Sequence, residues 1–249
     1  MGECHGVTAM ILLYTDFGLE GPYVGLLHRV IAGRVAATPI VDLMHDAPRF
    51  RPREAGLLLD ALAPGLPRRC IVVAVVDPGV GSSREALVAR VADRWYVGPD
   101  NGLLAPLLRG DDARAWRLPA VGGASPSFHG RDVFAPAAAS LAVGRFPAGV
   151  RAVDDWVDRD GPAGEDRVVY IDGFGNAMTG RRADSIPPGR APVLAGQALP
   201  RARTFSDREV GEAFWYENAF GLIEIAVNQG SAAAALGLAV GDPVTFAAE

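Results

Sequence analysis

The stretch from Val72 to Arg84 constrains the fold more than any other part of the chain. An apolar run over residues 72–76 ends in Asp77, and the turn Pro78-Gly79-Val80-Gly81 follows, with Arg84 beyond it. Such a run, bounded by turn signals, is typical of a strand buried on both faces of a parallel sheet. Ligands bind beyond the carboxyl ends of such strands. Asp77 and Arg84 are therefore functional candidates. By itself, however, the stretch slightly favours a turn-capping Asp paired with a surface Arg.

The N-terminal part of the chain alternates expected strands and helices. Apolar runs predict strands at residues 10–14, 40–44 and 72–76, and helical spacing predicts helices at residues 22–35 and 51–63. This order predicts an α/β domain with a central, mostly parallel sheet, right-handed crossovers and helices on both faces. Further on we expect a hairpin, a short helix through Leu104 and Leu107, another strand and a final helix, at residues 86–98, 104–107, 115–118 and 132–143.

The composition changes after this final helix. Residues 154–166 are rich in Asp, Gly and Pro, which indicates a linker. Short strands then follow at close spacing, which predicts a smaller, mostly antiparallel β domain with one helix at residues 231–236. Its strands are expected at residues 168–172, 191–194, 214–216, 222–227 and 243–246. The predicted domains are residues 1–155 and 156–249.

Composition limits the classes of function. The 249 residues carry a net charge of −5 with no basic stripe, which argues against nucleic-acid binding. All 24 basic residues are arginine, which excludes a Schiff-base lysine and a P-loop. The two cysteines, Cys4 and Cys70, form no disulfide framework or metal spacing. No apolar run is long enough to span a bilayer. We therefore expect a cytoplasmic protein that binds no membrane.

Three carboxylates end predicted parallel strands: Asp16, Asp46 and Asp77. Any one of them is more simply a turn residue. Asp16 and Asp77 each open an Asp-x-Gly turn, and both would meet at the same edge of the sheet. A carboxylate there can accept hydrogen bonds from both hydroxyls of a ribose. The sequence Gly79-x-Gly81-x-x-Arg84 lacks the third Gly of the dinucleotide fingerprint, so we reject an NAD site.

His129 precedes the predicted helix at residues 132–143. The positive end of a helix dipole favours a neutral imidazole, which could orient or deprotonate water. A histidine bonded only to backbone is an equally good interpretation. The other histidines, His5, His28 and His45, are interpreted as leader, helix-surface and turn residues. Because no pair has a metal-ligand spacing, we expect no metal site.

Two tracts of the second domain could bind a ligand. The turn Asp172-Gly173-Phe174-Gly175-Asn176 offers a carboxylate for an ammonium, an aromatic face and an amide for a carboxylate, although tight turn geometry alone would explain it. The tract from Tyr216 to Gly221, with the strand up to Gln229, is expected to form a core strand and polar turn. Its backbone could also hydrogen-bond a purine.

Six segments together resemble the S-adenosylmethionine (SAM) hydroxide adenosyltransferases, or SAM hydrolases, relatives of the fluorinase and chlorinase enzymes. They occur in the family's order through almost the whole chain, which makes the resemblance more specific than any single motif. The segments are Thr15-Asp16-Phe17-Gly18, Val76-Asp77-Pro78-Gly79-Val80-Gly81, Pro99-Asp100-Asn101-Gly102-Leu103, Phe128-His129-Gly130-Arg131-Asp132, Asp172-Gly173-Phe174-Gly175-Asn176 and Ile225-Ala226-Val227-Asn228-Gln229-Gly230.

The resemblance implies an α/β N-terminal domain, a β-barrel-like C-terminal domain and a homotrimer. Active sites would lie between one subunit's N-terminal domain and a neighbour's C-terminal domain. It assigns Asp77, Arg84 and His129 to catalysis and Asp16 to ribose binding. The methionine-binding set would be Asp172, Phe174 and Asn176, and the remaining substrate contacts would be Phe128, Asn218, Val227 and Gln229.

The implied reaction is attack of an activated water at the 5′ carbon of SAM, giving adenosine and L-methionine without a cofactor. Because methionine leaves as a neutral thioether, the leaving group needs no general acid; the water must be positioned. The first alternative is a SAM-dependent halogenase. The fluorinase carries Tyr and Ser where this chain has His129 and Gly130, and an insertion near Ala92-Asp93, so the hydrolase is favoured. The second alternative is a non-catalytic adenosine- or SAM-binding protein.

Overall fold

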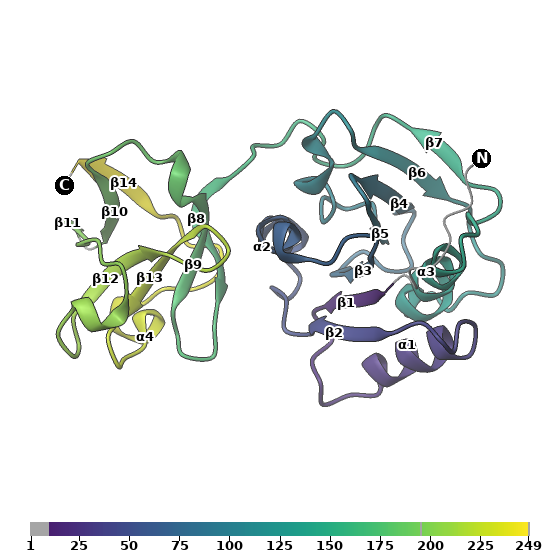
Figure 1. Cartoon of the computed structure of the whole chain (residues 1–249), viewed down its shortest axis with the longest axis horizontal. Coiled ribbons are helices and arrows are strands. Elements are labelled where there is room, and N and C mark those ends of the chain that lie inside the picture. The colour runs from purple at the N-terminus through teal and green to yellow at the C-terminus, as the bar shows by residue number, and fades with distance from the viewer. Residues whose placement is uncertain (1–9, 195, 249) are drawn as a thin grey trace. The chain divides into compact units, whose positions relative to one another are not determined.

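The computed structural model describes residues 10–194 and 196–248, which form two compact units (Figure 1). Among the described residues, the first unit comprises residues 10–56 and 66–161, and the second comprises residues 57–65, 162–194 and 196–248. The boundary between the units therefore falls within a helix, α2 (Pro52–Leu62), as well as between residues 161 and 162. Cys4 and His5 lie outside the described residues.

A seven-stranded sheet with the order β2-β1-β3-β5-β4-β6-β7 forms the centre of the first unit. Neighbours from β2 to β5 pair in parallel, and the pairs β5–β4, β4–β6 and β6–β7 are antiparallel. Five of the seven strands thus point the same way, which confirms the mostly parallel sheet. The strands are β1 (Ile11–Thr15), β2 (Ile40–Met44), β3 (Ile71–Val75), β4 (Ala86–Val91), β5 (Arg94–Pro99), β6 (Arg114–Leu118) and β7 (Arg151–Val153).

Helices pack on both faces of this sheet, as predicted. Alternate strand residues such as Leu13 and Val73 share one apolar cluster with α1 (Tyr23–Ala32) and α3 (Ala135–Ala142). On the opposite face, the Tyr14 hydroxyl donates a hydrogen bond to the Ala55 carbonyl of α2 at 2.8 Å. Strands β1 and β3 are buried along their whole length, because both faces are covered. Their carboxyl ends therefore have fixed positions.

Two predicted helices differ from the structure. The expected helix through Leu104 and Leu107 is reduced to one 3-10 turn, Leu107–Arg109, and turns fill residues 100–106. The helix predicted at residues 132–143 begins earlier, as a π-helical segment at Gly130–Phe134, before α3. Gly144, with φ 70°, ends the helix in the left-handed conformation that glycine favours. π-Helical segments are frequent at functional sites.

The second unit contains two antiparallel sheets, which confirms the small antiparallel domain (Figure 1). One has the order β12-β13-β9-β8 and the other β11-β10-β14. The expected strands are present, but the sequence interpretation missed β9, which joins β8 to β13. The elements are β8 (Glu165–Ile171), β9 (Ala177–Arg182), β10 (Arg190–Leu194), β11 (Gln197–Ala198), β12 (Ala213–Glu217), β13 (Leu222–Val227), α4 (Ala232–Leu236) and β14 (Thr245–Ala248).

Candidate functional site

Asp16 and Asp77 meet at one edge of the sheet because β1 and β3 are parallel neighbours in register, with Thr15 opposite Val75. The Asp16 amide also donates to the Val75 carbonyl at 3.3 Å. Burial raises the pKa of the Asp16 carboxyl, and the Asp77 charge adds to this rise. The two carboxylates are thus close enough to interact electrostatically, as the strand order predicted.

The Arg84 side chain joins Asp77 to His129. Its Nε donates to Asp77 Oδ1 at 3.1 Å, and its Nη2 donates to Asp77 Oδ2. The same Nη2 lies 3.0 Å from His129 Nδ1. The Asp77 and Arg84 side chains are only 5% and 8% exposed, so this is a buried pair and not the surface pair that the stretch alone favoured. Burial raises the pKa of Asp77, although the Arg84 charge acts in the opposite direction.

A close backbone contact holds the Gly79–Gly81 turn against the segment that carries His129. Gly81 has φ 82°, and a Cβ there would lie 2.4 Å from the Pro126 carbonyl oxygen. Only glycine fits this position. Within the turn, the Ser82 hydroxyl donates to the Gly79 carbonyl at 2.6 Å and accepts from the Arg84 amide at 3.2 Å. The turn therefore sets the direction of Arg84.

Two members of this group, Asp77 and His129, border a cavity of about 160 Å³ in the first unit, whereas Arg84 lies behind them and does not line it. Asp16, Asp77, Phe128 and His129 all line it, so the structure brings four of the predicted residues together. The sequence interpretation missed Phe50, which lines the same cavity, is 75% exposed and has φ 60°. Its amide is 3.5 Å from Asp16 Oδ2. No periodic pattern marks such a loop residue.

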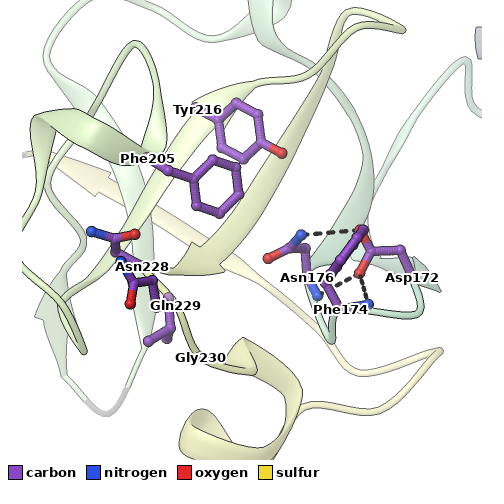
Figure 2. Close-up of a pocket in the computed structure, with 9 residues that line it drawn as sticks. Asp172, Phe174, Asn176, Phe205, Tyr216, Asn228, Gln229 and Gly230 are labelled. Carbon is purple, nitrogen blue, oxygen red and sulfur yellow. Dashed lines mark hydrogen bonds between the residues drawn. The ribbon is translucent and has the colours of Figure 1, made fainter.

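A second cavity, of about 720 Å³, lies within the second unit (Figure 2). Of the predicted residues it is lined by Asp172, Phe174, Asn176, Val227 and Gln229. Figure 2 shows the rings of Phe205 and Tyr216 beside each other, across the cavity from the turn that carries Asp172. The sequence interpretation missed Phe205, and it considered Tyr216 only as part of a strand and turn whose backbone could hydrogen-bond a purine, without a role for its ring.

Asp172 organises the turn that it begins. Its Oδ1 accepts from the Phe174 and Asn176 amides at 2.9 Å each, and its Oδ2 accepts from Asn176 Nδ2 at 3.0 Å. Phe174, in the middle of the turn, is 82% exposed. Asn176 is 4% exposed, and its Oδ1 has no hydrogen-bond partner among the described residues. A buried acceptor without a partner carries an energetic cost.

Asn218 lies apart from this cavity and borders another of about 560 Å³, with Arg201 and Arg203. Its Nδ2 donates to Glu224 Oε2 at 2.8 Å, and its Oδ1 accepts from the amides of residues 220 and 222. Its side chain therefore stabilises the turn. Glu224, 2% exposed, also accepts from the Tyr216 hydroxyl. The sequence contains a signal that could have identified this buried carboxylate: Glu224 is the single charged residue in the apolar run of β13.

Among the described residues, no cluster of three or more His, Cys, Asp or Glu side chains could hold a metal ion. Asp46 follows β2, is exposed and does not line either of the two cavities that contain predicted site residues. In the described part of the chain, no helix has the length and apolar character to cross a membrane.

Comparison with models of known protein families shows which family the chain belongs to. The profile of the SAM hydroxide adenosyltransferase N-terminal domain matches residues 11–150, and that of the C-terminal domain matches residues 166–245. The chain belongs to this family. All the residues assigned to the two cavities fall within the matched ranges.

Individual proteins similar to this chain match it over nearly its whole length. An (R)-S-adenosyl-L-methionine hydrolase of Thermus thermophilus is 43% identical, covering 94% of this chain and 98% of the relative. A protein of the same name from Salinispora arenicola is 36% identical, covering 97% and 98%. The crystal structure of an uncharacterized conserved protein from Thermotoga maritima matches with a TM-score of 0.83 at 29% identity, covering 95% of this chain and 99% of that chain.

Proposed function

We propose that this protein hydrolyses SAM to adenosine and L-methionine by attack of water at the ribose 5′ carbon. The observation that carries the proposal is the Asp77–Arg84–His129 group, in which Arg84 joins the two side chains that line a cavity together with Asp16. The names of the two relatives, at 43% and 36% identity over nearly their full length, support the same activity. Both names specify the R configuration, and we propose that this chain also acts on the R sulfonium epimer.

The reaction forms a bond between the water oxygen and the 5′ carbon and breaks the bond between that carbon and sulfur. The electron pair of the broken bond stays on sulfur, so methionine leaves as a neutral thioether. Water loses one proton. The protein must therefore hold the water in line and accept or release a proton, and these two tasks are typical of positioned polar side chains.

The contact between Arg84 and His129 determines how His129 acts. A guanidinium only donates hydrogen bonds, so His129 Nδ1 accepts, and a neutral imidazole then carries its proton on Nε2. We infer that Nε2–H donates to the oxygen of the attacking water and orients it. Asp77, whose pKa is raised by burial, then accepts the proton, since Arg84 uses two of its about four acceptor sites.

The remaining substrate groups are assigned to the two cavities. Asp16 accepts from the ribose hydroxyls, and Phe128 lines the same cavity. Asp172, Phe174 and Asn176 bind the methionine part, and the backbone near Val227 and Gln229 binds adenine. Asn218 contributes by holding its turn. No cofactor takes part in this scheme, because substitution at carbon by water requires no redox step.

We infer that the protein is a homotrimer in which each site combines the N-terminal domain of one subunit with the C-terminal domain of a neighbour. The cavity of about 160 Å³ is smaller than the roughly 300–1,000 Å³ of ordinary ligand pockets, so it holds only part of the substrate. The larger cavity, of about 720 Å³, belongs to the other unit.

Incubation with each SAM epimer in water enriched in ¹⁸O tests the activity. We expect adenosine and methionine from the R epimer, with the label in the 5′-hydroxyl of adenosine. Chloride and fluoride should not change the product, and 5′-halo-adenosine as the main product would instead identify a halogenase. Binding of adenosine without release of methionine over hours would identify a non-catalytic binding protein.

A further inference from the structure

A polar network that the proposed reaction does not use lies behind Asp16. Thr15, the last residue of β1, is fully buried, and its Oγ1 is 2.8 Å from Nδ1 of His45. His45 lies in the bend after β2, as the sequence indicated, and is buried there, at 5% exposed. Its Nε2 is 3.0 Å from Asp42 Oδ1, in a polar contact that is not a well-aligned hydrogen bond. Outermost is His28, with Nε2 at 2.7 Å from the same oxygen.

His45 and Thr15 hold the Asp16 turn from several directions. The Thr15 hydroxyl accepts from the Phe17 amide at 3.2 Å. The His45 carbonyl accepts from the Gly18 amide at 2.7 Å, and the Thr15 carbonyl accepts from the Ala47 amide at 3.1 Å. Asp16 therefore lies between Thr15 and Phe17, which are held by hydrogen bonds of this network. Gly18, whose amide binds the His45 carbonyl, has a left-handed φ of 69°.

The hydrogen bonds are consistent with one protonation pattern. Thr15 Oγ1 already accepts from Phe17, so its own proton is free to point at His45 Nδ1. The neutral His45 then carries its proton on Nε2, which faces the Asp42 carboxylate. In this pattern Thr15 Oγ1 and His45 Nδ1 are hydrogen-bonded to each other, and His45 Nε2–H faces Asp42 Oδ1 without good alignment. A buried hydrogen bond such as the one between Thr15 and His45 favours one local geometry, because breaking it leaves two buried polar atoms without partners.

We propose that Thr15 and His45 are positioning residues for the ribose site: they hold Asp16 in the orientation that accepts the two ribose hydroxyls. This rests on the proposed function, in which Asp16 binds ribose. Neither residue lines the cavity that contains Asp16. They act through the backbone of the Asp16 turn, so their loss should weaken recognition of the diol and leave the rest of the nucleoside unaffected.

The test compares two ligands on the full chain by calorimetry. Thr15→Val removes the hydroxyl at nearly constant volume. We expect this variant to bind adenosine about 10-fold more weakly, which is the effect of losing one to two hydrogen bonds. Binding of 2′,3′-dideoxyadenosine, which lacks both hydroxyls, should change less than about twofold, since it makes no such bonds. Thr15→Ser should restore adenosine binding. In an Asp16→Asn background, Thr15→Val should cause no further loss.

Thr179→Val is the matched control. Thr179 is also fully buried, accepts from the amide two residues later and donates to a distant carbonyl, that of Ile223. It should lower stability without changing the ratio of the two affinities. If Thr15→Val does not fold, His45→Phe retains a ring and removes Nδ1, and should shift the same ratio.

Equal losses for both ligands, or no recovery with Thr15→Ser, would overturn the positioning role while leaving SAM hydrolysis intact. A wild-type protein that neither hydrolyses SAM nor binds adenosine would overturn the proposed function itself, and this inference with it.

Discussion

Nη2 of Arg84 lies 3.0 Å from Nδ1 of His129, and the same guanidinium holds both oxygens of Asp77. One rigid planar cation therefore fixes the imidazole and the carboxylate relative to each other. Phe134 lies against the guanidinium, with its ring centre 5.5 Å from Cζ, so the cation is held on its flat side as well. The three side chains are one unit, and a change in Arg84 should disturb the other two.

Replacement Arg84→Lys tests this unit. Lysine keeps the charge but lacks the planar fork, so it cannot contact Asp77 through two nitrogens and His129 at once. We expect kcat for SAM hydrolysis to fall about 100-fold, comparable to the loss of one positioned donor. Steady-state kinetics measures this, with adenosine affinity as the control for an intact cavity. A variant with normal kcat would show that the guanidinium geometry is not needed.

The activity should also depend on the protonation of Asp77. Burial raises the pKa of this carboxyl even though Arg84 opposes the rise. As the pH falls, Asp77 gains its proton above the usual carboxyl range near ~4, loses its hold on Arg84 and can no longer accept a proton from water. We expect kcat to decline on the acid side with a midpoint above that range. Asp16→Asn should leave this acid limb in place, and an unchanged limb in Asp77→Asn would exclude Asp77 as its source.

The parts of the fold that depend on local patterns could be predicted from the sequence. Apolar runs located β1, β3 and β13, and the parallel order placed Asp16 and Asp77 at one edge. Spacing alone did not reveal β9, because residues 177–182 alternate poorly and include Gly180 and two arginines. It also did not reveal the π-helical segment after His129, which depends on tertiary packing.

Contacts between side chains far apart in the sequence were not revealed by local patterns. His45 was interpreted as a turn residue, but its buried contacts with Thr15 and Asp42, which the pairing of β1 with β2 brings about, were missed. The stretch around Arg84 by itself slightly favoured a surface position, but the side chain is 8% exposed and contacts Asp77, His129 and Phe134. In both cases the deciding contact joins segments far apart in the sequence, which periodicity does not report.

Glu224 should make stability depend on pH. Burial raises the pKa of its carboxyl, and the Asp172 charge adds to this, against the hydrogen bonds from Tyr216 and Asn218. Between the usual pKa and the raised one, the folded state binds more protons than the unfolded state, so stability falls as the pH rises. Glu224→Gln removes this fall. The free energy of unfolding of Glu224→Gln, measured with urea at several pH values, should increase relative to that of the wild type as the pH rises. Glu217→Gln, at an exposed position of β12, is the control, and its free energy of unfolding should change with pH as that of the wild type does.

Gly175→Ala should disrupt the turn that Asp172 organises. Gly175 has φ 85°, and an added Cβ would lie 2.0 Å from Ser231 Oγ and 3.1 Å from the Ser231 Cα. The left-handed conformation and the clash together should lower the free energy of unfolding by about 2–4 kcal/mol. Gly173→Ala is the control in the same turn, because a Cβ there meets nothing within 4 Å. Thermal unfolding of both variants distinguishes the effects, and equal stability would contradict this account of the turn.

If the protein forms the proposed homotrimer with sites shared between subunits, two inactive variants should restore each other's activity. Arg84→Lys disables the first unit, and Phe174→Arg places a cation at an 82% exposed position in the second, where it repels the positively charged substrate. After subunit exchange of an equal mixture, about a quarter of the sites should combine two intact halves if each site joins two subunits. SAM hydrolysis should then recover to a similar fraction of the wild-type rate. Each variant exchanged with itself is the control. A mixture that stays inactive, although mass measurements show mixed oligomers, would mean that each site is built within one chain.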